Sequence, residues 1–186
     1  MILVCRKYLW KEFVLLFLLI IGSACGQTSI ESAPEGEAQM EVQLASNAFT
    51  DGGTIPDKHT CDGEDISPHL VWSGIPEWTQ SVVLIMDDPD APVGTWVHWV
   101  LYDLPSDIKE ITEGEQGVGV AGINSWNKPE YGGPCPPPGK PHRYFFKLYA
   151  LDTELYLQPG AAKEDIEEAM LGHVLAQGQL MGLYSR

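Results

Sequence analysis

The sequence predicts a single domain with a mainly β fold that ends in two short helices. Three apolar runs of strand length cover residues 81–86, 96–102 and 143–151, and glycine, proline and aspartate bound them. After residue 160 the apolar residues recur at helical spacing instead. A chain of 186 residues is long enough for one sizeable core and too short for two.

The first half of the domain alternates short strands with irregular segments. Strands are expected over residues 42–44 and 70–72. Residues 55–68 contain too much proline, glycine and aspartate for regular structure, so a surface loop is expected there. Residues 113–140 are also predicted to be mostly loop. A loop of that length, with aromatic residues such as Trp126 in it, favours a functional role.

The C-terminal part combines one long strand with the helices. The apolar run at residues 143–151 is nearly continuous, which predicts a central strand covered on both faces. Ile166 and Met170 lie four residues apart, with acids before them and a glycine after them. That pattern predicts a helix over residues 161–171. Residues 173–184 are expected to form a second short helix.

Carboxylates are expected at the mouth of a buried strand, where an apolar run ends abruptly in acids and prolines. Residues two apart project to the same side of an extended chain, so Asp88 and Asp90 should lie together. By the same alternation, His142 and Tyr144 should share one face of the last strand, with Arg143 on the other.

The aromatic strand that follows the acids is expected to alternate as well. Its two faces would carry different sets of side chains: Trp96, His98, Val100 and Tyr102 on one, and Val97, Trp99 and Leu101 on the other. Carboxylates, histidines and a tyrosine beside buried strands are a plausible lining for one small polar cavity.

The formal net charge of −15 argues against a nucleic-acid-binding protein, because backbone phosphates need a basic face. It argues equally against adsorption to anionic lipid through charge. The simplest role of such an acidic surface is to keep the protein soluble.

Two cysteines, Cys61 and Cys135, fall within the domain, and neither belongs to a CxxC pair, so no structural zinc site is expected. A disulfide between them and two free thiols both fit the sequence, since it gives no distance between the two sulfurs. No metal or other cofactor is expected.

The N-terminus is predicted to be an export signal. Basic residues precede a short apolar core at residues 13–21, which is well short of the ~20 residues that span a bilayer. The small residues that end at Cys25 resemble the lipobox of bacterial lipoproteins. That resemblance implies removal of a signal peptide (residues 1–24), lipidation of Cys25 and a flexible tether over residues 25–40. The domain (residues 41–186) would then be anchored to the bacterial cell envelope, outside the cytoplasm. An uncleaved anchor and a plain signal peptide remain alternatives.

Three motifs in order identify a resemblance. They are Asp88-Pro89-Asp90-Ala91-Pro92, the following His98-Trp99, and the GxCPPxGxxHRY pattern over residues 133–144. Together they resemble the phosphatidylethanolamine-binding protein family, and within it the bacterial branch often described as Raf-kinase-inhibitor-like. The resemblance covers about residues 41–186. It implies a two-sheet antiparallel β fold with C-terminal helices and a small anion-binding cavity. The residues it assigns to that cavity are Asp88, Asp90, Trp96, His98, Pro137, His142, Tyr144 and Tyr184.

Two carboxylates in an anion-binding site would repel the anion unless positively charged groups balance them. We expect a carboxylate beside His98 or His142 to favour the imidazolium form, which donates to an anion. Asp90 is expected to pair with a buried Arg143 instead, because a planar guanidinium suits a carboxylate. Arg143 would then have a structural role.

Three classes of function follow. The first is a non-enzymatic binding protein for a small anion, such as a phosphate ester or a phospholipid head group. The second is a protein-facing inhibitor of a kinase or a protease, as the resemblance also implies. The third is a metal-dependent enzyme in which the ligands are Asp88, Asp90, His98 and His142. A nucleophile–base pair of Cys135 and His142 is a further enzymatic alternative.

Overall fold

The computed structural model describes residues 40–186, which form two β-sheets, one α-helix and a short 3-10 helix at Asp57–His59. The strands are β1 (Met40–Glu41), β2 (Gln43–Ser46), β3 (Leu70–Ser73), β4 (Ser81–Asp88), β5 (Trp96–Pro105), β6 (Glu110–Ile111), β7 (Val120–Ala121), β8 (His142–Leu151) and β9 (Val174–Tyr184), and the helix is α1 (Lys163–Ala169). The mainly β, two-sheet prediction is confirmed.

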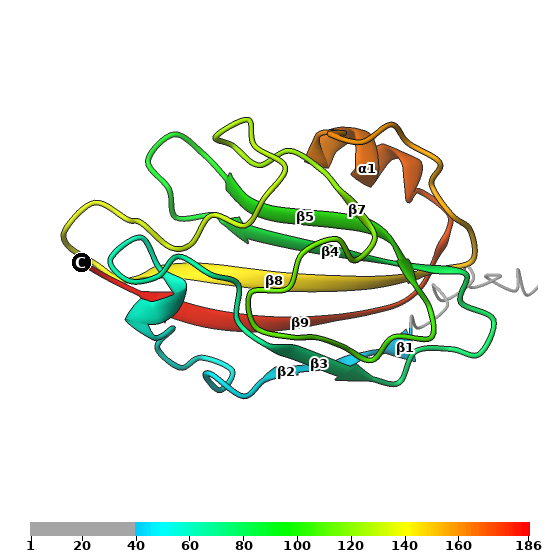
Figure 1. Ribbon diagram of the computed structural model, residues 1–186, viewed down its shortest axis with the longest axis horizontal. Coiled ribbons are helices and arrows are strands. Elements are labelled where there is room, and N and C mark those ends of the chain that lie inside the picture. Colours follow the sequence, from blue (N-terminus) through cyan, green and yellow to red (C-terminus); the bar gives the residue numbers. More distant parts are fainter. Residues whose placement is uncertain (1–39) are drawn as a thin grey trace, which may run out of the picture. The chain divides into compact units, whose positions relative to one another are not determined.

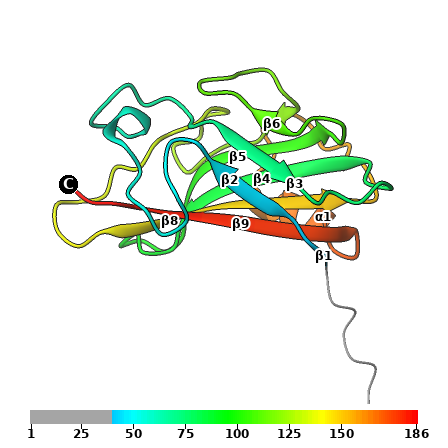
Figure 2. The same ribbon diagram turned by 90° about the horizontal axis from the view of Figure 1, so that it is seen from below.

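The larger sheet has six strands in the order β1-β9-β8-β4-β5-β7, and the smaller has three in the order β2-β3-β6. All pairs are antiparallel except β1 with β9. In Figures 1 and 2 the smaller sheet and α1 lie over opposite faces of the larger sheet. Two hydrophobic cores follow from this layering, one on each face.

Strand β4 shows why the larger sheet is central. All eight of its residues are buried, because alternate side chains enter different cores. Leu84 and Met86 pack with the smaller sheet, whereas Val83 and Ile85 pack with α1. A run that is apolar at consecutive positions is therefore required here.

Helix α1 forms where the helical spacing predicted it. Ile166 is fully buried on its inner face. The carboxylate of Asp165 accepts a hydrogen bond from the Ala162 backbone N–H, which caps the first turn.

The predicted second helix at residues 173–184 is wrong, because this segment is the strand β9. It pairs with the whole of β8, from His142 opposite Tyr184 to Leu151 opposite Val174. Apolar residues four apart share a face in a strand as well as in a helix, so the spacing alone misled. A side chain at Gly178 would collide with the Val42 carbonyl, so this glycine permits the close approach of Val42, the residue between β1 and β2, to β9.

The expected alternation along the aromatic strand is also wrong. Asp87 pairs with Val97 while its neighbour Met86 pairs with Trp99, so His98 is the extra residue of a β-bulge. Beyond the bulge the faces exchange. Val97 now shares a core with Val100 and Tyr102, and Trp99 and Leu101 lie in the other.

No helix within residues 40–186 is long and apolar enough to cross a membrane. The predicted signal peptide, the predicted lipidation site Cys25 and nearly all of the predicted tether fall outside the described residues.

Candidate ligand-binding site

Strand topology brings the polar residues of three strands to one end of the larger sheet. Strand β4 lies between β5 and β8 and runs antiparallel to both, so its C-terminal end meets their beginnings (Figure 1). Asp88 pairs there with Trp96, and Asp87 pairs with Phe145. Residues far apart in the sequence thereby surround one cavity.

This cavity, called the Asp88 cavity below, has a volume of about 290 Å³. Its wall is made by the end of β4, the β4–β5 turn, the beginnings of β5 and β8, and a proline-rich loop. The lining residues are Asp88, Ala91, Pro92, Val93, Trp96, His98, Trp126, Cys135, Pro136, Pro137, His142 and Tyr144.

A buried carboxylate–histidine pair forms one side of the Asp88 cavity. His142 Nδ1 lies 2.7 Å from Asp88 Oδ2, and the side chains are only 12% and 4% exposed. The other carboxylate oxygen accepts the Asp90 backbone N–H at 2.7 Å. Because Nδ1–H donates to Asp88, the ring is oriented and Nε2 is left for a ligand.

His98 is held in a single tautomer. Its Nδ1 lies 2.6 Å from the carbonyl oxygen of Gly132, which can only accept, so Nδ1 carries the proton. Burial of the ring lowers the pKa of His98 and outweighs the opposing influence of the Gly132 carbonyl and of the Asp88 charge. His98 is thus a neutral ring that offers the lone pair of Nε2, and the expected imidazolium form does not apply to it.

Tyr144 carries a hydrogen-bonding group without a partner. Its side chain is fully buried, and its hydroxyl makes no hydrogen bond within the described part of the chain. Burial, together with the charges of Asp88 and Asp90, raises the pKa of Tyr144, so the hydroxyl stays a neutral donor. The indole N–H of Trp96 is likewise buried and unpartnered among the described residues. Buried polar groups normally have partners, so two unpartnered donors beside one cavity mark it as a candidate binding site.

Aromatic rings fix the geometry around these groups. The His98 ring packs edge-on against Tyr144, with ring centroids 5.2 Å apart, and against Trp126 at 5.1 Å. Trp126 also meets Trp96 at 5.3 Å. Such contacts hold the polar atoms in place before any ligand arrives.

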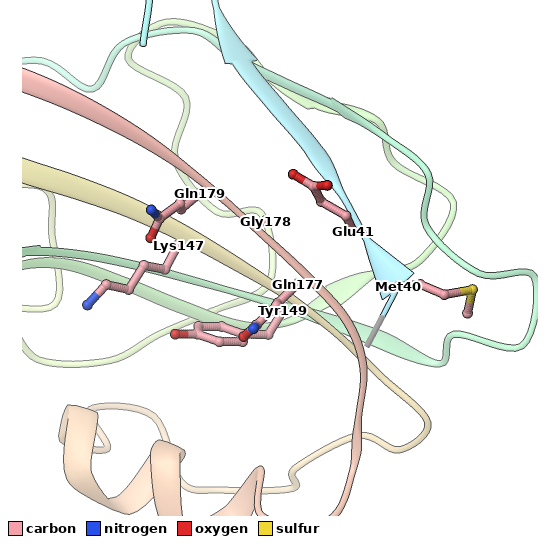
Figure 3. A pocket seen from close by; sticks show the side chains of 7 residues that line it. All are labelled: Met40, Glu41, Lys147, Tyr149, Gln177, Gly178 and Gln179. Atoms are coloured by element: carbon pink, nitrogen blue, oxygen red, sulfur yellow. The ribbon is translucent and has the colours of Figure 1, made fainter. Parts of the chain in front are cut away.

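A second cavity, of about 450 Å³, lies over β8 and β9 (Figure 3). Lys147 and Tyr149 of β8 face it opposite Gln179 and Gln177 of β9. Its cation is already engaged, since Lys147 donates to Asp87 at 2.8 Å. Its lining includes none of the buried, unpartnered side-chain groups of residues 40–186, so the smaller Asp88 cavity is the stronger candidate.

Residues 45–185 match the family model described as phosphatidylethanolamine-binding protein. The chain belongs to this family. It is 52% identical over 158 residues to a UPF0098 protein of Aquifex aeolicus, which covers 81% of this chain and 91% of that protein. Among solved structures, CT736 of Chlamydia trachomatis, a homologue of phosphatidylethanolamine-binding proteins, is 42% identical with a TM-score of 0.76, covering 78% of this chain and 98% of that one. Escherichia coli YbcL, described as a member of the mammalian family, is 29% identical with a TM-score of 0.73, covering 78% and 99% of the two chains.

Most of the residues assigned from the phosphatidylethanolamine-binding protein family meet at the Asp88 cavity. Those that line it are Asp88, Trp96, His98, Pro137, His142 and Tyr144, whereas Asp90 and Tyr184 do not. The Tyr184 hydroxyl instead donates to Asp62 at 2.8 Å. Sequence reasoning did not assign Pro92, Val93 or Trp126 to the site. For Trp126 the signal was its place in a long glycine- and proline-rich loop.

The proline-rich wall is tied to a distant loop. Cys61 and Cys135 form a disulfide with a Cα–Cα distance of 5.4 Å, which resolves the alternative that the sequence left open. Cys135 therefore has no thiol to act as a nucleophile beside His142. The four residues of the metal alternative do not gather into one metal site either. Within residues 40–186 no group of three or more His, Cys, Asp or Glu side chains is arranged to hold a metal ion.

Asp90 pairs with Arg143 as expected, but on the surface. The guanidinium donates from Nε to Oδ2 at 2.9 Å and from its terminal nitrogen to Oδ1 at 2.7 Å. The expectation that Arg143 is buried is wrong, since its side chain is 51% exposed. The pair closes the turn beside the Asp88 cavity, because Asp90 also accepts the Arg143 backbone N–H.

Replacing Asp90 with asparagine should lower the free energy of unfolding by about 1 kcal/mol at neutral pH, the amount expected of a well-oriented exposed pair. The hydrogen bonds of Arg143 lower the pKa of Asp90 to about 2. A depressed carboxyl pKa stabilises the fold above the unfolded value and loses that effect as pH falls toward the folded value. Urea denaturation of both proteins at neutral pH and near pH 3 measures this. The difference in unfolding free energy between wild type and Asp90→Asn should be smaller near pH 3 than at neutral pH. An equal difference at the two pH values would contradict the pairing.

Proposed function

We propose that the domain is a non-enzymatic binding protein for a small phosphorylated anion, held in the Asp88 cavity. The observation that carries the proposal is the buried Tyr144 hydroxyl, a donor that faces no acceptor among the described residues. A phosphate oxygen would satisfy it. Membership of the phosphatidylethanolamine-binding protein family supports the same class of ligand.

Two donors would hold such an anion, and they come from two strands of the larger sheet. Tyr144 of β8 supplies an O–H, and Trp96 of β5 supplies an indole N–H. Each hydrogen bond to a charged oxygen contributes more than a neutral one. The proline-rich wall is tied by the disulfide, so little conformational entropy is lost when a ligand enters.

The proposal includes a location for the domain: it is exported from the cytoplasm and anchored to the envelope by a lipid on Cys25. Disulfides persist chiefly in oxidising compartments outside the cytoplasm, and the Cys61–Cys135 bond supports such a location. Anchoring would leave the ligand chemistry unchanged and restrict the domain to ligands at the envelope.

Tyr144→Phe should weaken the binding of phosphoethanolamine about tenfold, because it removes one donor and keeps the ring. Titration followed by the imidazole NMR signals measures this, and wild-type His98 and His142 signals should both shift. Tyr156→Phe is the matched control, since Tyr156 is an exposed tyrosine that does not line the cavity. Wild-type histidine signals that stay still at millimolar ligand, or equal affinity of Tyr144→Phe and wild type, would refute the proposal.

A further inference from the structure

The lining of the Asp88 cavity can recognise an anion by hydrogen bonding more than by opposite charge. None of the described residues that line it is lysine or arginine. Fully deprotonated phosphate groups are usually bound by such cations. The guanidinium groups of Arg143 and of Arg186, which reaches Cys135 of the lining, are paired with Asp90 and Asp62. Which anion fits is therefore decided by the pattern of donors and acceptors.

One of these groups is an acceptor that a bare anion cannot satisfy. His98 and Gly132 hold each other twice, through Nδ1 to the Gly132 carbonyl at 2.6 Å and from the Gly132 N–H to the His98 carbonyl at 3.0 Å. This double contact fixes the proton on Nδ1, and the ring is only 3% exposed. The lone pair on Nε2 would repel an oxygen that carries no hydrogen.

Asp88 adds to this requirement. Its two oxygens already accept hydrogen bonds from the Asp90 N–H and from His142, yet its negative charge stays beside the cavity. A ligand with a low negative charge is therefore favoured over a dianion. The unpartnered donors on Tyr144 and Trp96 still call for bare oxygens. The complementary ligand carries both bare oxygens and one O–H.

We propose that the Asp88 cavity selects the singly protonated form of a small, soluble phosphate monoester over tetrahedral anions that lack a proton. The ligand's P–O–H donates to His98 Nε2, while its bare oxygens accept from Tyr144 and Trp96. Sulfate esters and phosphate diesters, the latter including most phospholipid head groups, cannot make the first of these bonds. The cavity volume of about 290 Å³ suits a small ligand. This selectivity rests on the proposed function and narrows its ligand class.

The test compares methyl phosphate with methyl sulfate, using the full chain. At about pH 5, methyl phosphate is mostly a monoanion, because the second pKa of a phosphate ester is about 6. The imidazole NMR signal of His98 in the same buffer reports whether that ring is neutral, as the comparison requires. The two ligands then have equal charge and nearly equal shape, and they differ by one proton. Calorimetric titration should show methyl phosphate binding at least about tenfold more tightly, and dimethyl phosphate binding as weakly as methyl sulfate.

A variant pair localises the effect. His98→Phe keeps an aromatic ring and removes the acceptor, so the preference for methyl phosphate should fall to about threefold or less. His173→Phe, at an exposed histidine paired with Asp152, should keep the full preference. If His98→Phe does not fold, the comparison of ligands on the wild type decides alone. Equal affinity for methyl phosphate and methyl sulfate overturns the selectivity and leaves the proposed function standing. Absence of binding to either ligand overturns both.

Discussion

Replacing Cys61 and Cys135 together with serine should lower the free energy of unfolding by about 4 kcal/mol. The disulfide joins residues separated by 74 positions, and closing a loop of that length in the unfolded chain is expected to contribute this much. Both cysteine residues are exposed, so the serine hydroxyls meet water and add little penalty of their own. The loss therefore measures the cross-link rather than a disturbed core.

Urea denaturation of the oxidised wild type and of the double variant measures the effect. Wild type treated with reductant is the matched control, and it should unfold at the same urea concentration as the variant. The link also holds the Pro136–Pro137 wall of the Asp88 cavity, so phosphoethanolamine affinity should fall several-fold in both reduced forms. A variant within about 1 kcal/mol of the oxidised wild type would show that other contacts hold the two loops together.

The strands that were predicted correctly are those whose sequence pattern has one structural explanation. Strand β4 is apolar at consecutive positions because both of its faces are buried. Strand β8 is central as predicted, but buried and half-buried residues alternate along it, so only one of its faces is fully covered. The prediction for β9 was wrong because apolar residues four positions apart fit a helix as well as a strand. Its identity depends on pairing with β8 and on the approach of Val42 to Gly178. These contacts join segments far apart in the chain, and no local pattern encodes them.

The candidate site divides in a similar way. The match between a guanidinium and a carboxylate was enough to pair Asp90 with Arg143, and the family resemblance named the residues that converge around Asp88. The bulge at His98 was not predictable, because it is defined by the register against β4. The same bulge places the His98 ring against Tyr144. The hydrogen bond from His98 to Gly132, which determines the tautomer, joins residues 34 positions apart and could not be predicted from the sequence either.

The second large effect is expected at Asp87, the residue before Asp88. Asp87→Asn should lower the free energy of unfolding by about 3 kcal/mol at neutral pH. The Asp87 side chain is 1% exposed and accepts from Lys147 at 2.8 Å and from Lys163 at 2.7 Å, which ties β4 to β8 and to α1. Asparagine keeps the shape and removes the β4 carboxylate charge that balances the largely buried Lys163. Lys163 retains just a longer contact of 3.4 Å with Glu167.

Two comparisons separate charge from shape at Asp87. Burial acts to lower the pKa of Lys163, but the hydrogen bond and charge of Asp87 outweigh it, so the pKa is raised. A raised lysine pKa stabilises the fold below the unfolded value and loses that effect as pH rises through the folded one. The difference in unfolding free energy between wild type and Asp87→Asn should therefore shrink as pH rises past the ordinary lysine pKa of about 10.4. The triple variant Asp87→Leu, Lys147→Met and Lys163→Met should recover much of the lost stability, because an apolar cluster needs no charge balance. If the triple variant is less stable than Asp87→Asn, the buried carboxylate holds α1 by more than its charge, through the geometry of its two hydrogen bonds.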